Sequence, residues 1–235
     1  MSRKILIICA VMLCSAVMAA PVWAATELKI AQVSDIQGLD PHRANDAASS
    51  HVLKQVYNYL VTLDKDLNIV PDLAERWENP DDLTWVFYLR KGVLFHNGEE
   101  FTANDVKFTI ERMQDPETRY TGTALRGKEM NKVEAVDRYT VKITTQVPFQ
   151  PLLFGLTRHE MAILNEKAVR EAGENYSKQP VGTGPFKFVE WVHGDRVVLE
   201  KNEKYFEGVP KIDRLIFRSI PESSTRIVEL ESGGV

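Results

Sequence analysis

The clearest hydrophobic pattern in the chain is an alternation of apolar and mixed positions over residues 83–89. One face of this segment would carry only large apolar side chains, namely Leu83, Trp85, Phe87 and Leu89. A period of two is the spacing of a β-strand with one buried face. We therefore predict a strand here, followed by a tight turn at Asn97–Gly98, because glycine adopts positive φ without steric cost.

A helix is predicted directly after this turn. Thr102 stands three residues before Asp105, a spacing at which a hydroxyl and a carboxylate cap the first backbone amides of a helix. Apolar residues and one threonine then recur at helical spacing: Val106, Thr109, Ile110 and Met113. This pattern predicts that one face of the helix is buried.

Similar patterns predict further elements on both sides of this unit. Strands or hairpins are expected at residues 28–33, 63–71, 133–144, 186–191 and 212–220. Helices are expected at residues 48–60, 152–156 and 162–172, and a last helix is expected to begin at Ser223 or Ser224 with Ile227 and Leu230 facing inward. Strands and helices thus mix along the chain, which indicates an α/β protein.

Two blocks of the sequence resemble one known protein family. The first block runs from Leu73 to Val106 and contains LAERW, LTWVFYLRKGV, FHNG and FTANDV in this order. The second is the Gly-Thr-Gly-Pro-Phe step at residues 182–186, which leads into a predicted strand. Both blocks resemble the bacterial solute-binding proteins of the peptide and nickel class, which are the ligand receptors of ABC importers. Because these residues concern folding rather than chemistry, the same framework could serve proteins with quite different ligands.

The resemblance implies a fold as well as a function. It implies an α/β, periplasmic-binding-protein-like (type II) first lobe with an inserted α+β subdomain, and a second lobe that is missing. Residues 25–60 and 181–235 would form the core subdomain of the lobe, and residues 61–180 the inserted subdomain. The sequence reaches only about half of the family's pattern, so we interpret it as the N-terminal portion of such a protein.

An export signal is predicted at residues 1–24. Arg3 and Lys4 give it a positive start, residues 5–20 are apolar, and Ala24 supplies the small residue at the cleavage site. A membrane anchor is the alternative, but the apolar run is shorter than the roughly 20 residues that span a bilayer. We therefore expect a cleaved signal peptide and a periplasmic protein.

Charge and cysteine content narrow the function classes. The chain has 29 basic and 33 acidic residues, and removal of residues 1–24 would take away Arg3, Lys4 and both cysteines. Without cysteine, the mature chain has no disulfide or thiolate nucleophile. An acidic excess without a basic cluster argues against nucleic acid, whose binding depends on neutralising phosphates.

The polar residues offer little chemistry for catalysis or metal binding. The five histidines are scattered and lack ligand spacing. Asp64, Asp66 and Asn68 resemble a calcium loop, but the glycine and glutamate that such a loop needs are absent. We expect a solvated turn there, no metal and no cofactor. Arg158, His159 and Glu160 are the best enzyme-like cluster and support a periplasmic hydrolase as the alternative function.

Ligand-binding residues are implied by the resemblance. In the family, the loop after the first strand lies at the mouth of the cleft between the lobes, which places Ser34, Asp35, Gln37 and Gly38 there; a plain surface turn is the other interpretation. Arg158 would contribute a charge for the ligand. The expected protein is a monomeric receptor that binds a peptide or a similar small solute and delivers it to a membrane permease. A non-functional fragment of such a receptor is a further alternative.

Overall fold

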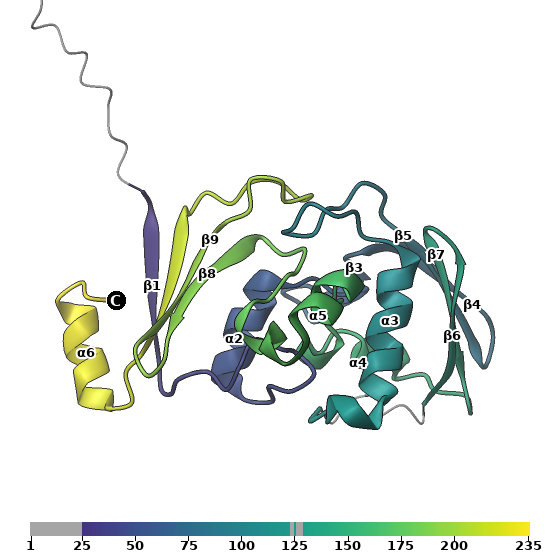
Figure 1. The fold of residues 1–235 in the computed structure, drawn as a ribbon, viewed down its shortest axis with the longest axis horizontal. Helices are drawn as coiled ribbons and strands as arrows, with labels where there is room; N and C mark the ends of the chain where they lie inside the picture. The colour runs from purple at the N-terminus through teal and green to yellow at the C-terminus, as the bar shows by residue number, and fades with distance from the viewer. Residues whose placement is uncertain (1–24, 123–124, 126–128) are drawn as a thin grey trace, which may run out of the picture.

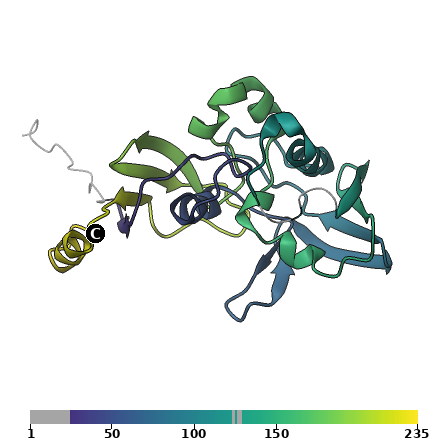
Figure 2. The same ribbon diagram turned by 90° about the horizontal axis from the view of Figure 1, so that it is seen from below.

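The computed structural model describes residues 25–122, 125 and 129–235, so the signal peptide predicted for residues 1–24 lies outside the described residues. Within those ranges, two four-stranded sheets stand apart in an elongated molecule, most of the helices lie between them, and the C-terminal helix lies outside the first sheet (Figure 1). Figure 2 shows the same arrangement from below, with α2 (Ala47–Val56) near the middle.

The first sheet joins the beginning of the chain to its later part. Its order is β1-β10-β9-β8, where β1 and β10 are parallel and the other pairs are antiparallel. The strands are β1 (Glu27–Gln32), β8 (Phe186–Val192), β9 (Arg196–Lys201) and β10 (Arg214–Ser219). Helix α2 packs on one face of this sheet, and its apolar residues form a core with apolar residues of the strands and of residues 36–44.

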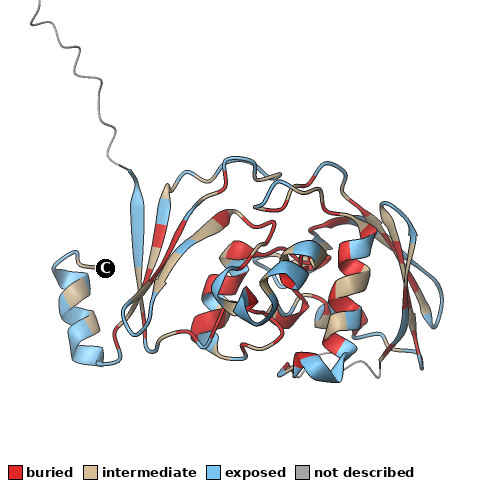
Figure 3. Ribbon diagram, in the orientation of Figure 1, coloured by how far each residue is buried: buried red, intermediate tan, exposed pale blue. Residues whose placement is uncertain are grey.

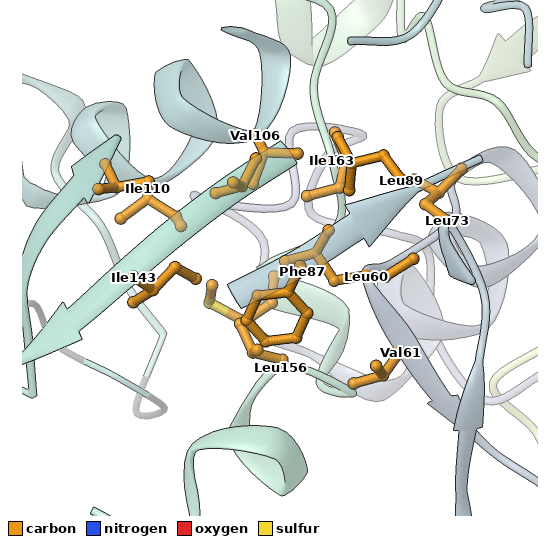
Figure 4. Packing of buried hydrophobic residues seen from close by; sticks show 14 of the residues in the cluster. Leu60, Val61, Leu73, Phe87, Leu89, Val106, Ile110, Ile143, Leu156 and Ile163 are labelled. Atoms are coloured by element: carbon orange, nitrogen blue, oxygen red, sulfur yellow. The ribbon is translucent and has the colours of Figure 1, made fainter. Parts of the chain in front are cut away.

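The second sheet is antiparallel, in the order β4-β5-β7-β6. Its strands are β4 (Ala74–Asp81), β5 (Thr84–Leu89), β6 (Met130–Asp137) and β7 (Thr140–Thr145), and α3 (Ala103–Gln114) packs against β6 and β7. Trp85, Phe87 and Leu89 are buried as the alternation predicted. Phe87 packs with Ile110 and other apolar residues in the core of this half (Figure 4).

Shorter elements connect the two halves. They are the hairpin β2 (Val61–Leu63) and β3 (Ile69–Pro71), helices α4 (Leu152–Gly155) and α5 (Glu166–Ala172), and the 3-10 turns η1 (Pro116–Thr118), η2 (His159–Met161) and η3 (Gly173–Lys178). The β2–β3 turn is closed by Asp64, whose carboxylate accepts hydrogen bonds from the backbone of Asp66 and Asn68. The two core clusters divide the described residues into two parts, while the exact subdomain boundaries stay a prediction.

The turn chemistry predicted from the sequence is present. Gly98 has a φ of 88°, and the backbone amide of Thr102 donates to the Asp105 carboxylate at 2.9 Å at the start of α3. Gly173 ends α5 with a φ of 53°. These positions confirm the predicted Asn-Gly turn, the cap of α3 and the end of α5.

The two glycines of the Gly-Thr-Gly-Pro step allow its backbone to lie directly against the backbone at the end of α2. A Cβ atom on Gly182 would lie 2.0 Å from the carbonyl oxygen of Val56, and one on Gly184 would lie 2.5 Å from that of Gln55. The amide of Gly184 donates to the Val56 carbonyl oxygen at 2.9 Å, which satisfies a carbonyl at the end of α2. This close approach agrees with the role predicted for the two glycines.

Four predictions about elements were wrong or incomplete. The helix expected over residues 48–60 ends at Val56, because Tyr57 is extended. The helix expected from residue 162 begins at Glu166, because Asn165 caps it by accepting the amide of Ala168. Strands β4 and β9 were not foreseen. The last helix, α6 (Ser223–Glu231), does not turn its apolar residues inward: Ile227 is 58% and Leu230 is 69% exposed, and Figure 3 shows no buried residue on it.

Among the described residues, no helix has the length and apolar character needed to cross a membrane.

Candidate functional site

The candidate site lies where the two parallel strands of the first sheet end. β1 and β10 pair in register from Glu27–Arg214 to Gln32–Ser219, so their carboxyl ends share the lower edge of the sheet in Figure 1. In open α/β sheets, ligands bind outside the carboxyl ends of parallel strands. Residues 33–46, which we call the β1–α2 segment, leave β1 at this edge and lead to the amides at the start of α2. Those amides favour negatively charged ligand groups.

A buried ion pair anchors the β1–α2 segment to the second half of the molecule. Arg112 on α3 donates to both carboxylate oxygens of Asp40, at 3.0 Å to Oδ1 and 2.6 Å to Oδ2. The side chain of Asp40 is 3% exposed and that of Arg112 is 11% exposed. Burial alone would raise the pKa of Asp40, but the hydrogen bonds and charge of Arg112 outweigh burial and lower this pKa. The pair therefore stays ionised and fixes the segment against α3.

His42 is held neutral beside this ion pair. Its Nδ1 lies 2.9 Å from the guanidinium of Arg112. Because arginine only donates, Nδ1 accepts and the ring proton is on Nε2. Burial, and then the charge of Arg112, lower the pKa of His42 to about 3. The ring Nε2 has no hydrogen-bond partner among the described residues.

Two buried tyrosines, Tyr57 and Tyr176, help to fix the position of the β1–α2 segment. The hydroxyl of Tyr57, just after α2, lies 3.2 Å from the Leu39 carbonyl oxygen and 3.0 Å from the Tyr176 hydroxyl. The amide of Leu39 donates to the Ser177 carbonyl oxygen at 3.0 Å. The position of the segment is therefore set by α2 and by η3, as well as by α3.

Polar residues at the end of the segment join it to residues 118–121. Arg43 donates from Nε to the Thr118 carbonyl oxygen at 3.0 Å, and Asn45 donates from Nδ2 to the Thr121 carbonyl oxygen at 3.2 Å. The amide of Thr121 in turn donates to the His42 carbonyl oxygen at 3.0 Å. These contacts make one continuous surface from parts of the chain that are far apart in sequence.

The cluster at residues 158–160 borders the same surface. Glu160 is fully buried, and one of its oxygens lies 3.2 Å from Arg158, whose side chain is 41% exposed. His159 contacts the other carboxylate oxygen at 3.2 Å through Nδ1, and its Nε2 lies 3.1 Å from the Ala44 carbonyl oxygen. Burial opposes ionisation of Glu160, but hydrogen bonds and the charges of His159 and Arg158 lower its pKa. The cluster thus holds Arg158 beside the β1–α2 segment.

The donors and acceptors at this edge suit hydrogen bonding rather than metal chemistry. Within the part of the chain that the structure describes, no group of three or more His, Cys, Asp or Glu residues is placed to hold a metal ion. The carboxylates of Asp40 and Glu160 are both occupied by cationic side chains. The surface offers amides, hydroxyls and one half-exposed arginine.

Comparison with protein families gives a decisive match. The model of "Bacterial extracellular solute-binding proteins, family 5 Middle" matches residues 68–235, well over half of the chain. The chain belongs to this family.

Known relatives of this family 5 chain bind several kinds of solute. It is 37% identical over 221 residues to the glutathione-binding protein GsiB of Pectobacterium atrosepticum, covering 93% of the chain and 43% of that protein. Among solved structures, it resembles the periplasmic binding protein DppA of Helicobacter pylori in complex with the peptide STSA. That match has a TM-score of 0.81 and 31% identity, and it covers 90% of this chain and 46% of DppA.

A third relative extends the range of ligands. NikZ from Campylobacter jejuni in complex with Ni(L-His) has a TM-score of 0.81 and 29% identity, and the match covers 91% of this chain and 43% of NikZ. The family 5 chain therefore spans less than half the length of each relative. These matches confirm the predicted resemblance and the α/β fold of a partial periplasmic-binding-protein lobe. They give no support to the hydrolase alternative.

The predicted loop residues of this family 5 chain are in different environments. Ser34 and Gln37 are exposed, and Gly38 is buried against Ser177. The carboxylate of Asp35 accepts hydrogen bonds from the Trp191 indole at 3.0 Å and from the Gly194 amide at 2.7 Å. Asp35 therefore ties the segment to the β8–β9 turn. The ligand contacts assigned to these residues stay a prediction.

Other residues of this surface were not among the ligand contacts named from the sequence, although the predicted loop extended to Asp40. Asp40, His42 and Asn45 lie in the run DPHRAND that precedes α2, and such a polar run before a helix could have drawn attention to them. Arg112 carries no local signal, because it lies 72 residues away from its partner Asp40. Only the fold brings the two together.

Proposed function

We propose that this chain forms the first lobe of a periplasmic ligand receptor of an ABC importer, which binds a peptide or a similar small solute. The observation that carries the proposal is a family 5 fold with a polar surface outside the carboxyl ends of β1 and β10. Glutathione, the peptide STSA and Ni(L-His), as named for the relatives, are all small polar compounds with amino-acid chemistry.

The chemistry of such ligands fits the groups on this surface. In the proposal, Arg158 pairs with a carboxylate of the ligand, because a guanidinium binds carboxylate oxygens in two parallel hydrogen bonds. Ser34 and Gln37 supply exposed hydroxyl and amide groups for the ligand's polar backbone. Asp35 and Gly38 set the course of the loop that carries them.

The proposal includes the cellular setting. The signal peptide is cleaved after Ala24, and the receptor acts in the periplasm as a monomer that hands its ligand to a membrane permease. It binds without converting the ligand, and it needs no cofactor and no nucleic acid. The absence of catalysis is supported by its relatives, which are binding proteins.

A receptor of this kind traps its ligand between two lobes that close over it. The chain spans 43% of GsiB, so one lobe supplies only part of the contacts. We therefore expect the chain alone to bind weakly or not at all, and a two-lobed protein to bind tightly.

Calorimetry on a chimera tests this expectation. The chain would be joined to the part of P. atrosepticum GsiB that the match leaves uncovered, and titrated with glutathione, the peptide STSA and Ni(L-His). We expect the chimera to bind at least one of them, and R158Q to weaken binding roughly tenfold or more, as for a lost charged hydrogen bond. R138Q, a change of an exposed arginine on the distant β6–β7 turn, is the matched control.

Two results would contradict the proposal. One is a folded chimera that binds none of the three compounds. The other is recovery of a cleaved peptide, detected by mass spectrometry after incubation, which would restore the hydrolase.

A further inference from the structure

A cavity of about 380 Å³ opens at the other end of α2 from the β1–α2 segment. It lies between the last turn of α2, the β2–β3 hairpin and the loop after β9. α2 has ten residues, so about 15 Å of helix separates its first turn from the cavity at its last turn. Ligand pockets in proteins have roughly 300–1,000 Å³, which makes this one suitable for a small molecule.

A buried carboxylate forms part of the cavity wall. Asp72 is 4% exposed, and its Oδ1 accepts from Asn58 Nδ2 at 2.9 Å while its Oδ2 accepts from the Tyr59 amide at 2.8 Å. Both donors are neutral, and each carboxylate oxygen has capacity for a second hydrogen bond. Burial raises the pKa of Asp72 to about 7, more than these hydrogen bonds lower it. The carboxylate is therefore incompletely compensated.

Arg90 does not form a direct ion pair with the carboxylate of Asp72. Arg90 donates from Nε to the backbone carbonyl oxygen of Asp72 at 2.6 Å, and its guanidinium lies over the Phe206 ring at 5.5 Å. Its main contacts are thus with the backbone and an aromatic face. Lys54, on the last turn of α2, also lines the cavity but is exposed.

Further acceptor groups line the same cavity. The hydroxyl of Tyr205 lies 3.3 Å from Asn58 Nδ2 and donates to the Glu207 carboxylate at 3.1 Å. Tyr59 is 6% exposed, and its hydroxyl has no hydrogen-bond partner within the described ranges. Carboxylate and phenol oxygens thus gather around Asp72, while Lys54 and the hydroxyls of Thr62 and Thr157 also line the cavity.

We propose that this cavity is a second binding site, for a small primary ammonium compound. Three N–H donors of such a group match the free capacity of Asp72 and the oxygens of Tyr205 and Glu207. The limited volume favours a short, compact amine. The lining of this site does not include Ser34, Gln37 or Arg158, the proposed ligand contacts, so variants of Asp72 test it apart from the receptor function.

A thermal-shift titration with n-butylammonium chloride tests the site. We expect this salt to raise the Tm of the purified protein more than sodium chloride at equal ionic strength, while uncharged n-butanol has no such effect. D72N should weaken the ammonium effect roughly tenfold or more, because it removes a charge-assisted hydrogen bond. D137N, in the exposed β6–β7 turn, is the matched control and should bind like the unchanged protein.

Binding should also strengthen from about pH 6 to about pH 8, because Asp72 must lose its proton to pair with the ammonium. The other charged groups that face Asp72 are Glu207, Arg90 and Lys54.

Three results would overturn the proposal: an equal effect of butanol, unchanged ammonium binding by D72N, or ammonium binding that appears only in K54A. The last would mean that Lys54 itself occupies the cavity. Should D72N fail to fold, E207Q and Y205F replace it. The proposal then requires that each variant weakens ammonium binding. It also requires that n-butylammonium, added to the unchanged protein, shifts NMR signals mainly around Tyr59.

Discussion

At the scale of single residues, the contact most sensitive to change is the buried pair of Asp40 and Arg112. Both side chains are largely excluded from water. We expect R112Q to lower the free energy of unfolding by about 3–5 kcal/mol, because it leaves the Asp40 carboxylate buried without a counter-charge. Urea unfolding measures the loss.

A double variant separates the interaction energy of the Asp40–Arg112 pair from the energy of the other contacts that each residue makes. We expect D40N/R112Q to be more stable than the sum of the two single losses predicts, since no charge is then left unpaired. Additive losses would show that each residue acts through other contacts. R138Q, at an arginine that is 60% exposed, should change stability by less than about 1 kcal/mol.

His42 gives the protein a pH-dependent stability with a definite sign. Its pKa falls from 6.5 to about 3 on folding, so between these values the unfolded chain binds a proton that the folded protein does not. Stability is therefore lost as pH falls below about 6.5, by at most about 5 kcal/mol from this residue. His96, whose pKa is lowered to about 4 mainly by burial, adds to the loss in the same direction.

Replacing His42 tests this pH dependence. H42Q keeps a side chain that can accept from Arg112 but cannot titrate. We expect its free energy of unfolding to fall less steeply than that of the unchanged protein between about pH 6.5 and pH 4, as measured by urea unfolding at several pH values. Parallel curves would mean that folding leaves the pKa of His42 unchanged. Asp72 has the opposite sign: its raised pKa stabilises the fold as pH falls from about 7 to 3.8, and H42Q leaves this effect in place.

At the scale of elements, the approach of the Gly-Thr-Gly-Pro step to α2 limits substitution. We expect G184A to lower the free energy of unfolding by about 3 kcal/mol or more, because its Cβ would meet backbone atoms of Gln55 and Val56 that have little freedom to move. G38A is the control for stability, since its Cβ would meet Ser177 at an ordinary 3.7 Å. Equal unfolding midpoints for G184A and G38A would contradict the tight contact.

The elements that could be predicted from the sequence are those whose pattern is local. The alternation in β5 and the capped start of α3 contain their own signals, and both were confirmed. Strand β9 was missed because Val197, Val198 and Leu199 are all buried, and a strand covered on both faces lacks alternation. Strand β4 contains a proline and several charges, and its pairing with β5 is set by the tertiary structure.

In the candidate site, too, features with a local sequence pattern could be predicted and contacts between distant residues could not. The loop after the first strand could be located through the resemblance, and Arg158 does lie beside it, at the contact between His159 and Ala44. What holds this surface together could not be found, because Asp40 and Arg112 belong to elements that meet only in the fold. Contacts between elements distant in sequence therefore need the structure, and the ligand contacts themselves stay a prediction.

At the scale of the whole molecule, α6 is the element least integrated into the described structure. Its side chains Ile227, Val228 and Leu230 are 58%, 62% and 69% exposed, whereas α2 and α3 each bury an apolar face (Figure 3). Arg218 on β10 holds it through an ion pair with Glu229. Neighbouring apolar side chains exposed together favour association with another surface.

Replacing apolar residues of α6 with glutamine tests how much this helix contributes to the stability of the fold. We expect I227Q/L230Q to change the free energy of unfolding by less than about 0.5 kcal/mol, since both side chains already face water and glutamine is a good helix former. Urea unfolding measures the change. I110Q on α3 is the matched control: Ile110 is 1% exposed, so burying an amide there should cost about 3 kcal/mol or more. A loss for I227Q/L230Q as large as that for I110Q would show that α6 is packed in solution, and its apolar face would then not be available to another surface.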